Sequence, residues 1–126
     1  PGTGDIMLDI NSFVTKPKMI LVTTPHIASS TVAIKAGIAA QKMGQEIIGV
    51  VENMSYFVPN DENKKYYIFG KDGGVEASKS LNTELICQIP IEAPLGNNCI
   101  YDITQKAGLA INDIVDYLIF NLNIKK

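Results

Sequence analysis

The sequence predicts an α/β fold, a parallel sheet with helices on both of its faces. Three short apolar runs, at 19–22, 46–52 and 85–89, are separated by segments with helical character, and prolines stop the first and the third. Short runs dominated by apolar residues are typical of strands that are buried on both faces. Strands that alternate with helices pair in parallel, because each crossover returns the chain to the same end of the sheet.

Helices are expected before, between and after these strands, and the longest connection also contains an exposed excursion. The expected helices cover 6–13, 31–43, 75–81 and 113–122. Ser29 or Ser30 should cap the second helix, and Gly44 should end it. Gly73 and Gly74 are interpreted as the turn that opens the third helix, and the polar, turn-rich stretch 58–67 as the excursion.

Composition narrows the range of functions. The 126 residues suit one domain or part of a larger one, and 46% hydrophobic with 19% charged residues is an ordinary globular balance. The net charge is −2 with no basic block, which argues against nucleic acid as a partner. No apolar run is long enough for a membrane span, so no membrane role is expected. Two cysteines, Cys87 and Cys99, indicate a reduced compartment, the cytoplasm or an organelle.

Polar or turn-forming residues follow each predicted strand, at 23–25, 52–55 and 88–92, and a similar segment, 1–5, opens the chain. Ligands bind beyond the carboxyl ends of the strands in open parallel sheets, so these segments should share one rim. Small residues at a helix start also favour an anion. Each segment could equally be an ordinary turn, and their conjunction is what indicates a site. His26 has no neighbouring ligands, and no metal site is predicted.

Five motifs in a fixed order carry a family resemblance. They are Pro1-Gly2-Thr3-Gly4-Asp5, Thr23-Thr24-Pro25, Gly49-Val50-Val51-Glu52-Asn53-Met54-Ser55-Tyr56-Phe57, Ile68-Phe69-Gly70-Lys71-Asp72-Gly73-Gly74 and Gln88-Ile89-Pro90-Ile91. In this order they resemble the Mrp/ApbC family of deviant P-loop ATPases, relatives of MinD and ParA. The resemblance runs from Pro1 to about Pro94, and the string from Glu52 to Phe57 is its most specific part.

The resemblance implies a nucleotide site made of two groups of residues. In the family, the first motif is switch II, near the γ-phosphate, where it couples hydrolysis to conformational change. The asparagine of the Glu-Asn-Met-Ser string contacts the adenine base, whose edge needs both a donor and an acceptor. The implied nucleotide-binding residues are Gly2, Thr3, Gly4, Asp5, Asn53, Pro90, Ile91 and Glu92.

Two departures from the family limit what this chain should do alone. The phosphate-binding loop and the Walker B aspartate lie upstream of the first motif in the family, so residues 1–126 are interpreted as the carboxy-terminal portion of one P-loop NTPase domain. Without that loop, its lysine and the held Mg²⁺, the chain should not hydrolyse ATP. Cluster-carrying members also place a C-x-x-C after the Met-Ser-Tyr-Phe string, where two such pairs in a dimer bind one [4Fe–4S] cluster. Here the interval 58–65 contains no cysteine.

The leading hypothesis is therefore part of an ATP-binding iron–sulfur cluster carrier or assembly factor, a homodimer that serves iron–sulfur apo-proteins. One alternative is a positioning ATPase of the MinD/ParA kind, and another is a non-enzymatic remnant that docks onto a full-length relative. A partial sheet should leave a strand edge unpaired and an apolar face uncovered. We expect this edge and this face to be covered either by a second copy of the chain or by upstream sequence.

Overall fold

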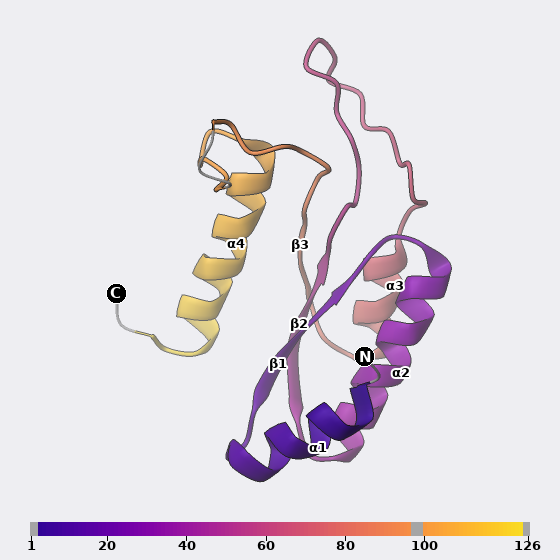
Figure 1. The fold of residues 1–126 in the computed structure, drawn as a ribbon, viewed down its shortest axis with the longest axis vertical. Helices are drawn as coiled ribbons and strands as arrows, with labels where there is room; N and C mark the ends of the chain where they lie inside the picture. The colour runs from indigo at the N-terminus through magenta and orange to yellow at the C-terminus, as the bar shows by residue number, and fades with distance from the viewer. Residues whose placement is uncertain (1–2, 97–99, 125–126) are drawn as a thin grey trace.

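The computed structural model describes residues 3–96 and 100–124, and it confirms the parallel α/β fold (Figure 1). Strands and helices alternate along the chain. In order, they are α1 (Thr3–Phe13), β1 (Lys18–Thr23), α2 (Ile27–Lys42), β2 (Glu46–Glu52), α3 (Gly73–Ser80), β3 (Leu85–Gln88) and α4 (Lys106–Asn121). The three strands thus lie within a residue of the positions that the apolar runs predict.

The described residues form a parallel three-stranded sheet in the order β1-β2-β3. β1 pairs with β2 along its whole length, from Lys18 opposite Glu46 to Thr23 opposite Glu52. The exposed ion pair between Lys18 and Glu46, at 3.5 Å, adds little stability at the start of these strands. All three strands end on the same rim, because parallel strands share one direction.

Two helices cover one face of the sheet. Figure 1 shows α2 and α3 together on one side of the strands, with α4 on the other. The larger apolar core lies under α2 and α3, where small residues let the helices approach the sheet closely. Its buried members are Leu21, Ala33, Ala40, Ile47, Val50, Ala77 and Leu81.

The second face is covered less completely. A smaller core under α4 contains Val51, Cys87 and Ala110. The Tyr117 hydroxyl of α4 donates a hydrogen bond of 2.6 Å to the carbonyl of Ile48 in β2, which holds the helix against the sheet. α4 packs on β3, and Val22 of β1 keeps 59% of its surface exposed.

The start of α2 differs from the prediction. The expectation that Ser29 or Ser30 caps this helix is wrong, because the helix begins at Ile27 and His26 is its N-cap. The backbone of His26 is extended (φ −69°, ψ 134°), and its Nδ1 accepts a hydrogen bond of 3.1 Å from the amide of Ala28. The imidazole nitrogen therefore caps the helix in the way that a serine or aspartate oxygen usually does at this position.

The other helices also begin earlier than their sequence patterns suggest. α3 begins at Gly73 rather than near 75, and α4 begins at Lys106 rather than 113. The excursion 58–67 does project from the body of the molecule (Figure 1), and residues 60–67 are exposed. No helix in the described part of the chain is long and apolar enough to cross a membrane.

Candidate functional site

Asn53 stands immediately after β2, on the rim where the strands end. Its backbone N–H donates to the carbonyl of Thr23 at 2.7 Å, which ties it to the end of β1. Its side-chain Oδ1 accepts a hydrogen bond of 2.9 Å from the amide of Met54, whose φ of 53° is left-handed. This local turn orients the side chain and leaves the amide nitrogen Nδ2 to donate to a ligand.

The segment after β3 lies beside Asn53. The amide of Ile89 donates to the carbonyl of Glu52 at 2.8 Å, the amide of Ser55 to Ile89 at 2.9 Å, and the amide of Ile91 to Tyr56 at 2.7 Å. These bonds continue the pairing of β2 and β3 beyond the regular strands. The two rim segments are therefore held together by their backbones.

A pocket of about 370 Å³ opens between these two segments. Asn53, Pro90, Ile91 and Glu92, four of the eight residues predicted from the sequence, line it. The other lining residues are Met54 and Ile89, which belong to the predicted rim segments but not to the predicted nucleotide-binding residues, and Tyr101 and Ile111, which sequence reasoning did not single out. A slot lined by both aliphatic side chains and polar groups, the Asn53 amide among them, can take a flat heterocycle such as a nucleotide base.

Glu92 lines this pocket and also contacts the helix that follows it. Its Oε2 accepts a hydrogen bond of 2.8 Å from the amide of Ala107, at the start of α4. A carboxylate is stabilised there by the unpaired N–H groups of the helix terminus. The hydroxyl of Tyr101 donates to the Glu92 carbonyl at 2.8 Å. Glu92 thus joins the pocket to the start of α4.

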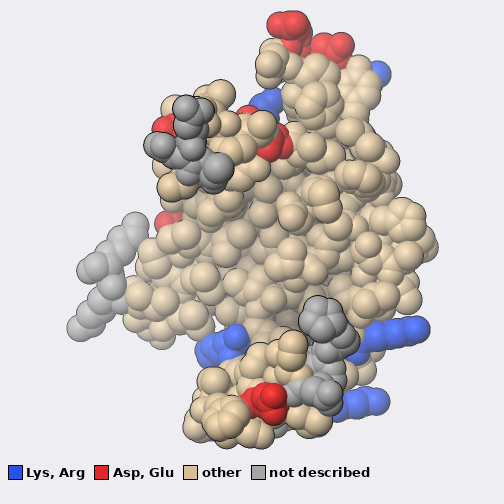
Figure 2. All heavy atoms as spheres, viewed as in Figure 1, with Lys and Arg blue, Asp and Glu red and all other residues tan. Residues whose placement is uncertain are grey.

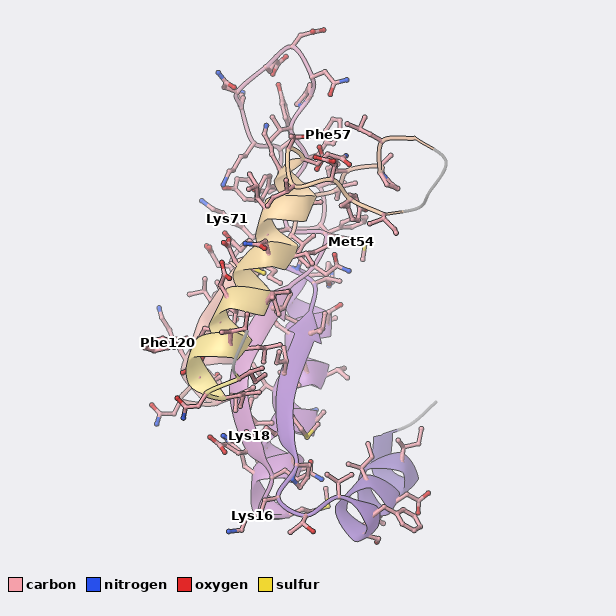
Figure 3. All side chains as sticks on the ribbon, turned by 90° about the vertical axis from the view of Figure 1, so that its left-hand side faces the viewer. Lys16, Lys18, Met54, Phe57, Lys71 and Phe120 are labelled. Atoms are coloured by element: carbon pink, nitrogen blue, oxygen red, sulfur yellow. The ribbon has the colours of Figure 1, made fainter. Side chains whose placement is uncertain are left out.

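The described part of the first motif does not lie at this rim. Gly2 lies outside the described residues, and Thr3, Gly4 and Asp5 form the first turn of α1. Figure 3 shows α1 beside the end of the sheet marked by Lys16, far from Met54 and Phe57. Apolar side chains of α1 are exposed there, with Phe13 at 86%. The switch II function of this motif stays a prediction.

Gly73 and Gly74 are explained by close packing. A Cβ on Gly73 would lie 2.6 Å from the carbonyl oxygen of Pro25, and one on Gly74 would lie 2.7 Å from Cβ of Glu52. The amide of Gly74 already donates to Oε2 of Glu52 at 2.6 Å. This N–H is therefore already hydrogen-bonded within the protein, in agreement with the interpretation of the two glycines as a turn at the start of a helix.

The excursion after Phe57 carries tyrosines and lysines. An isolated antiparallel bridge joins Phe57 to Tyr66 at its base. The ammonium group of Lys65 lies 4.0 Å from the centroid of the Tyr56 ring, and Lys71 and Lys64 approach two further tyrosines at 4.9 and 5.3 Å. Each such contact is worth about 0.5–1 kcal/mol at an exposed site, so they give the loop a preferred shape.

A cluster site is not formed by the residues that the structure describes. They contain no group of three or more histidines, cysteines or carboxylates close enough to hold a metal ion. Burial, with a further contribution from the Asp113 charge, raises the pKa of the Cys87 thiol to about 11. A cluster needs thiolates, and burial makes deprotonation of this thiol more costly than that of an exposed cysteine. Cys99 lies outside the described residues.

The fold is that of an α/β nucleotide-binding protein of the P-loop NTPase class. It is similar to the structure of a nucleotide-binding protein from Archaeoglobus fulgidus in complex with ADP, with a TM-score of 0.55 and 26% sequence identity. That similarity covers 95% of this chain and 47% of the other.

The chain belongs to the family described as the NUBPL iron-transfer P-loop NTPases, whose model matches residues 1–112. It is 36% identical to the iron–sulfur cluster carrier protein of Bacillus subtilis over 119 residues, which are 90% of this chain and 34% of that protein. It is 42% identical over 96 residues to the protein of the same name from Synechocystis, covering 75% of this chain and 27% of that one. The chain thus spans about a third of the length of these relatives.

Proposed function

We propose that this chain forms the adenine-side wall of an ATP-binding protein of the iron–sulfur cluster carrier kind. The observation that supports this best is the pocket in which Asn53, from the end of β2, meets residues 90–92, from the end of β3. Nδ2 of Asn53 can donate to an adenine edge, and its Oδ1, which accepts one hydrogen bond from Met54, keeps a second lone pair to accept from the base. Met54 and Ile111 provide apolar surface for the faces of the base. The A. fulgidus relative is described in complex with ADP.

The phosphates of ATP need contacts of another kind. Phosphoryl transfer depends on a glycine-rich loop whose N–H groups and lysine surround the phosphates with Mg²⁺. No loop of the form Gly-x-x-x-x-Gly-Lys-Ser/Thr occurs in the 126 residues. We therefore propose that they are the carboxy-terminal portion of a P-loop NTPase domain, and that the chain alone does not hydrolyse ATP. A switch II function for Gly2, Thr3, Gly4 and Asp5 beside the γ-phosphate would require α1 to lie at the pocket end of the sheet, the opposite end from the one where Thr3, Gly4 and Asp5 stand in this structure.

An open apolar face supports the idea that further structure packs on this chain. β1 is an edge strand, and the groove between it and α2 has a volume of about 670 Å³. Val22 and Val32, which line it, are 59% and 67% exposed. Figure 2 shows a broad uncharged surface between charged groups at the two ends of this face. An unpaired edge beside such a surface is normally covered in a soluble domain.

The homodimer in this proposal can be tested with the chain alone. If the open face is covered by a second copy, light scattering should show a mass that rises with concentration. A single monomeric species that melts cooperatively would instead show that the exposed edge of β1 needs no cover.

The cluster would be cargo, and the described residues do not supply its ligands. Anaerobic reconstitution with iron and sulfide should therefore leave the chain without the visible absorbance of a [4Fe–4S] cluster. Stoichiometric cluster incorporation that survives Cys99→Ser would contradict this expectation, because Cys87 would then have to act as a ligand from within the core.

Nucleotide binding is the direct test of the proposed function. ADP should shift the NMR signals of Asn53 and Ile91 in the isolated chain, weakly because the phosphate loop is absent. Asn53→Ala should remove the shift at Ile91, whereas Asn60→Ala, an exposed asparagine in the excursion, should leave it unchanged. A chimera joined to the preceding part of the B. subtilis relative should bind ADP in a calorimeter. Failure of both the chain and the chimera to bind ADP would refute the proposal.

A further inference from the structure

Glu52 is a buried carboxylate at the junction of the rim segments. Only 1% of its surface is exposed. Its Oε1 accepts hydrogen bonds from the Ser55 hydroxyl at 2.5 Å and from Nε2 of Gln88 at 2.8 Å. Its Oε2 accepts one from the amide of Gly74 at 2.6 Å. One side chain thereby joins the turn after β2, the end of β3 and the start of α3.

These three donors are all neutral. Among the residues that the structure describes, the one ion pair is Lys18 with Glu46, at the far end of the sheet. Burying a carboxylate costs several kcal/mol, and hydrogen bonds to neutral groups offset that cost only in part. An apolar side chain would therefore serve core stability at least as well. What the carboxylate adds is a fixed geometry for the donors around it.

That geometry bears directly on Asn53. Asn53 lies between Glu52, whose carbonyl is bonded to Ile89, and Ser55, whose hydroxyl is bonded to the Glu52 carboxylate. The chain on both sides of Asn53 is thus anchored to one buried group. The Met54 amide then sets the Asn53 side chain by donating to its Oδ1. A shift of the Ser55 anchor would release this turn and the amide it orients.

We propose that Glu52 is a positioning residue for the adenine-side wall, one that aims the Asn53 amide into the pocket through Ser55 and Gln88. Glu52 is not among the residues that line the pocket. This inference rests on the proposed function, because the pocket has to hold a base for the aim of Asn53 to matter. It also accounts for the glycine at 74, since a Cβ there would displace the Glu52 side chain.

The first test needs no ligand. Glu52→Gln keeps the shape of the side chain but places an NH₂ group against donors that now face a carboxylate. In this variant the χ1 of Asn53, measured by three-bond NMR couplings, should change from one rotamer to an average of several. The signals of α2, such as that of Ala40, should stay in place. Glu46→Gln, an exposed glutamate on the same strand, is the matched control. A single Asn53 rotamer in a folded Glu52→Gln protein would overturn the proposal.

Ser55→Ala provides a second route if Glu52→Gln does not fold. It removes one donor and leaves the carboxylate with Gln88 and Gly74. The Asn53 rotamer should again become averaged, to a smaller extent. An unchanged rotamer in this variant would equally overturn the proposal, because Ser55 is the residue through which Glu52 holds the turn that contains Asn53.

The second test is a double-mutant cycle on ADP affinity. Glu52→Gln and Asn53→Ala should each weaken ADP binding about fivefold, the effect of one hydrogen bond. The double variant should bind ADP as tightly as the single variant that has the lower affinity. Losses that multiply would show that Glu52 acts independently of Asn53 and would overturn the proposal. Absence of ADP binding to the unmodified chain would refute the proposed function, and the rotamer measurement would still decide whether Glu52 positions Asn53.

Discussion

The contact between Gly37 of α2 and Leu81, which follows α3, predicts a change of sign in a pair of substitutions. A Cβ on Gly37 would lie 2.6 Å from Cδ1 and 2.8 Å from Cδ2 of Leu81. Leu81 is 2% exposed, and Nε2 of Gln41 donates to its carbonyl at 2.9 Å. Because its backbone is held and its surroundings are packed, Leu81 cannot move away without disturbing the larger core.

The magnitudes follow from two opposing effects. Alanine in place of glycine inside a helix gains about 1 kcal/mol, whereas overpacking a core costs about 1–3 kcal/mol. Gly37→Ala alone should therefore lower the free energy of unfolding by about 0–2 kcal/mol. Leu81→Ala alone should lower it by about 2–5 kcal/mol. In the Leu81→Ala background the clash is gone, so Gly37→Ala should raise the free energy of unfolding by about 1 kcal/mol.

Urea unfolding of the four proteins measures this coupling, with an added osmolyte if the Leu81→Ala protein is too unstable to fold. Gly44→Ala is the control. Gly44 has a φ of 80° and nothing within 4 Å of an added Cβ. Gly44→Ala should therefore lower the free energy of unfolding by about 1–2 kcal/mol, equally in both backgrounds. The reasoning is refuted if Gly37→Ala has the same effect with and without the Leu81 side chain.

Two further predictions concern the packing around the sheet. Gly73→Ala should lower the free energy of unfolding by about 1–3 kcal/mol or more in urea, because the new Cβ would meet backbone atoms of Pro25, at 2.6 and 2.8 Å, that cannot rotate away; stability equal to wild type would contradict this packing. In a Cys99→Ser background, Cys87 should react with a thiol reagent at pH 8 only as fast as the fold opens, and rapid labelling without denaturant would refute its burial. Burial, with a further contribution from Asp113, raises the pKa of Cys87 from 9.0 to about 11. The contribution of the protonated Cys87 thiol to the free energy of unfolding should therefore be complete below pH 9 and be lost as the pH rises toward 11. Cys87→Ala should remove this decline.

The strands were predictable because their signal is local. A run such as 46–52 contains enough consecutive apolar residues to require burial wherever it lies in the chain. The helix starts were less predictable. The pattern favoured Ser29 or Ser30 as a cap, but His26 is extended and its ring nitrogen reaches the Ala28 amide first. The start of α4 was missed because Glu92, far away in sequence, supplies the acceptor for its first turn.

Half of the candidate site was also predictable. Asn53 and residues 90–92 follow neighbouring parallel strands, so their meeting at one rim follows from topology alone. Tyr101 and Ile111, which complete the pocket, lie beyond the part of the chain that carries family motifs. Their sequence surroundings resemble an ordinary loop and helix, and only the return of α4 across the sheet brings them to the pocket.

By itself, the sequence determined the order of strands and helices, their parallel pairing and the rim at which Asn53 stands, because apolar runs and turn residues act over a few neighbours. Tertiary structure alone decided that Glu52 turns inward to the Gly74 amide, that Glu92 accepts a hydrogen bond from the first turn of α4 and that α1 lies at the opposite end of the sheet from the pocket. The two carboxylates look alike in the sequence. Their functions differ because the position of a carboxylate depends on the hydrogen-bond donors around it. Those donors come from residues that only folding brings near.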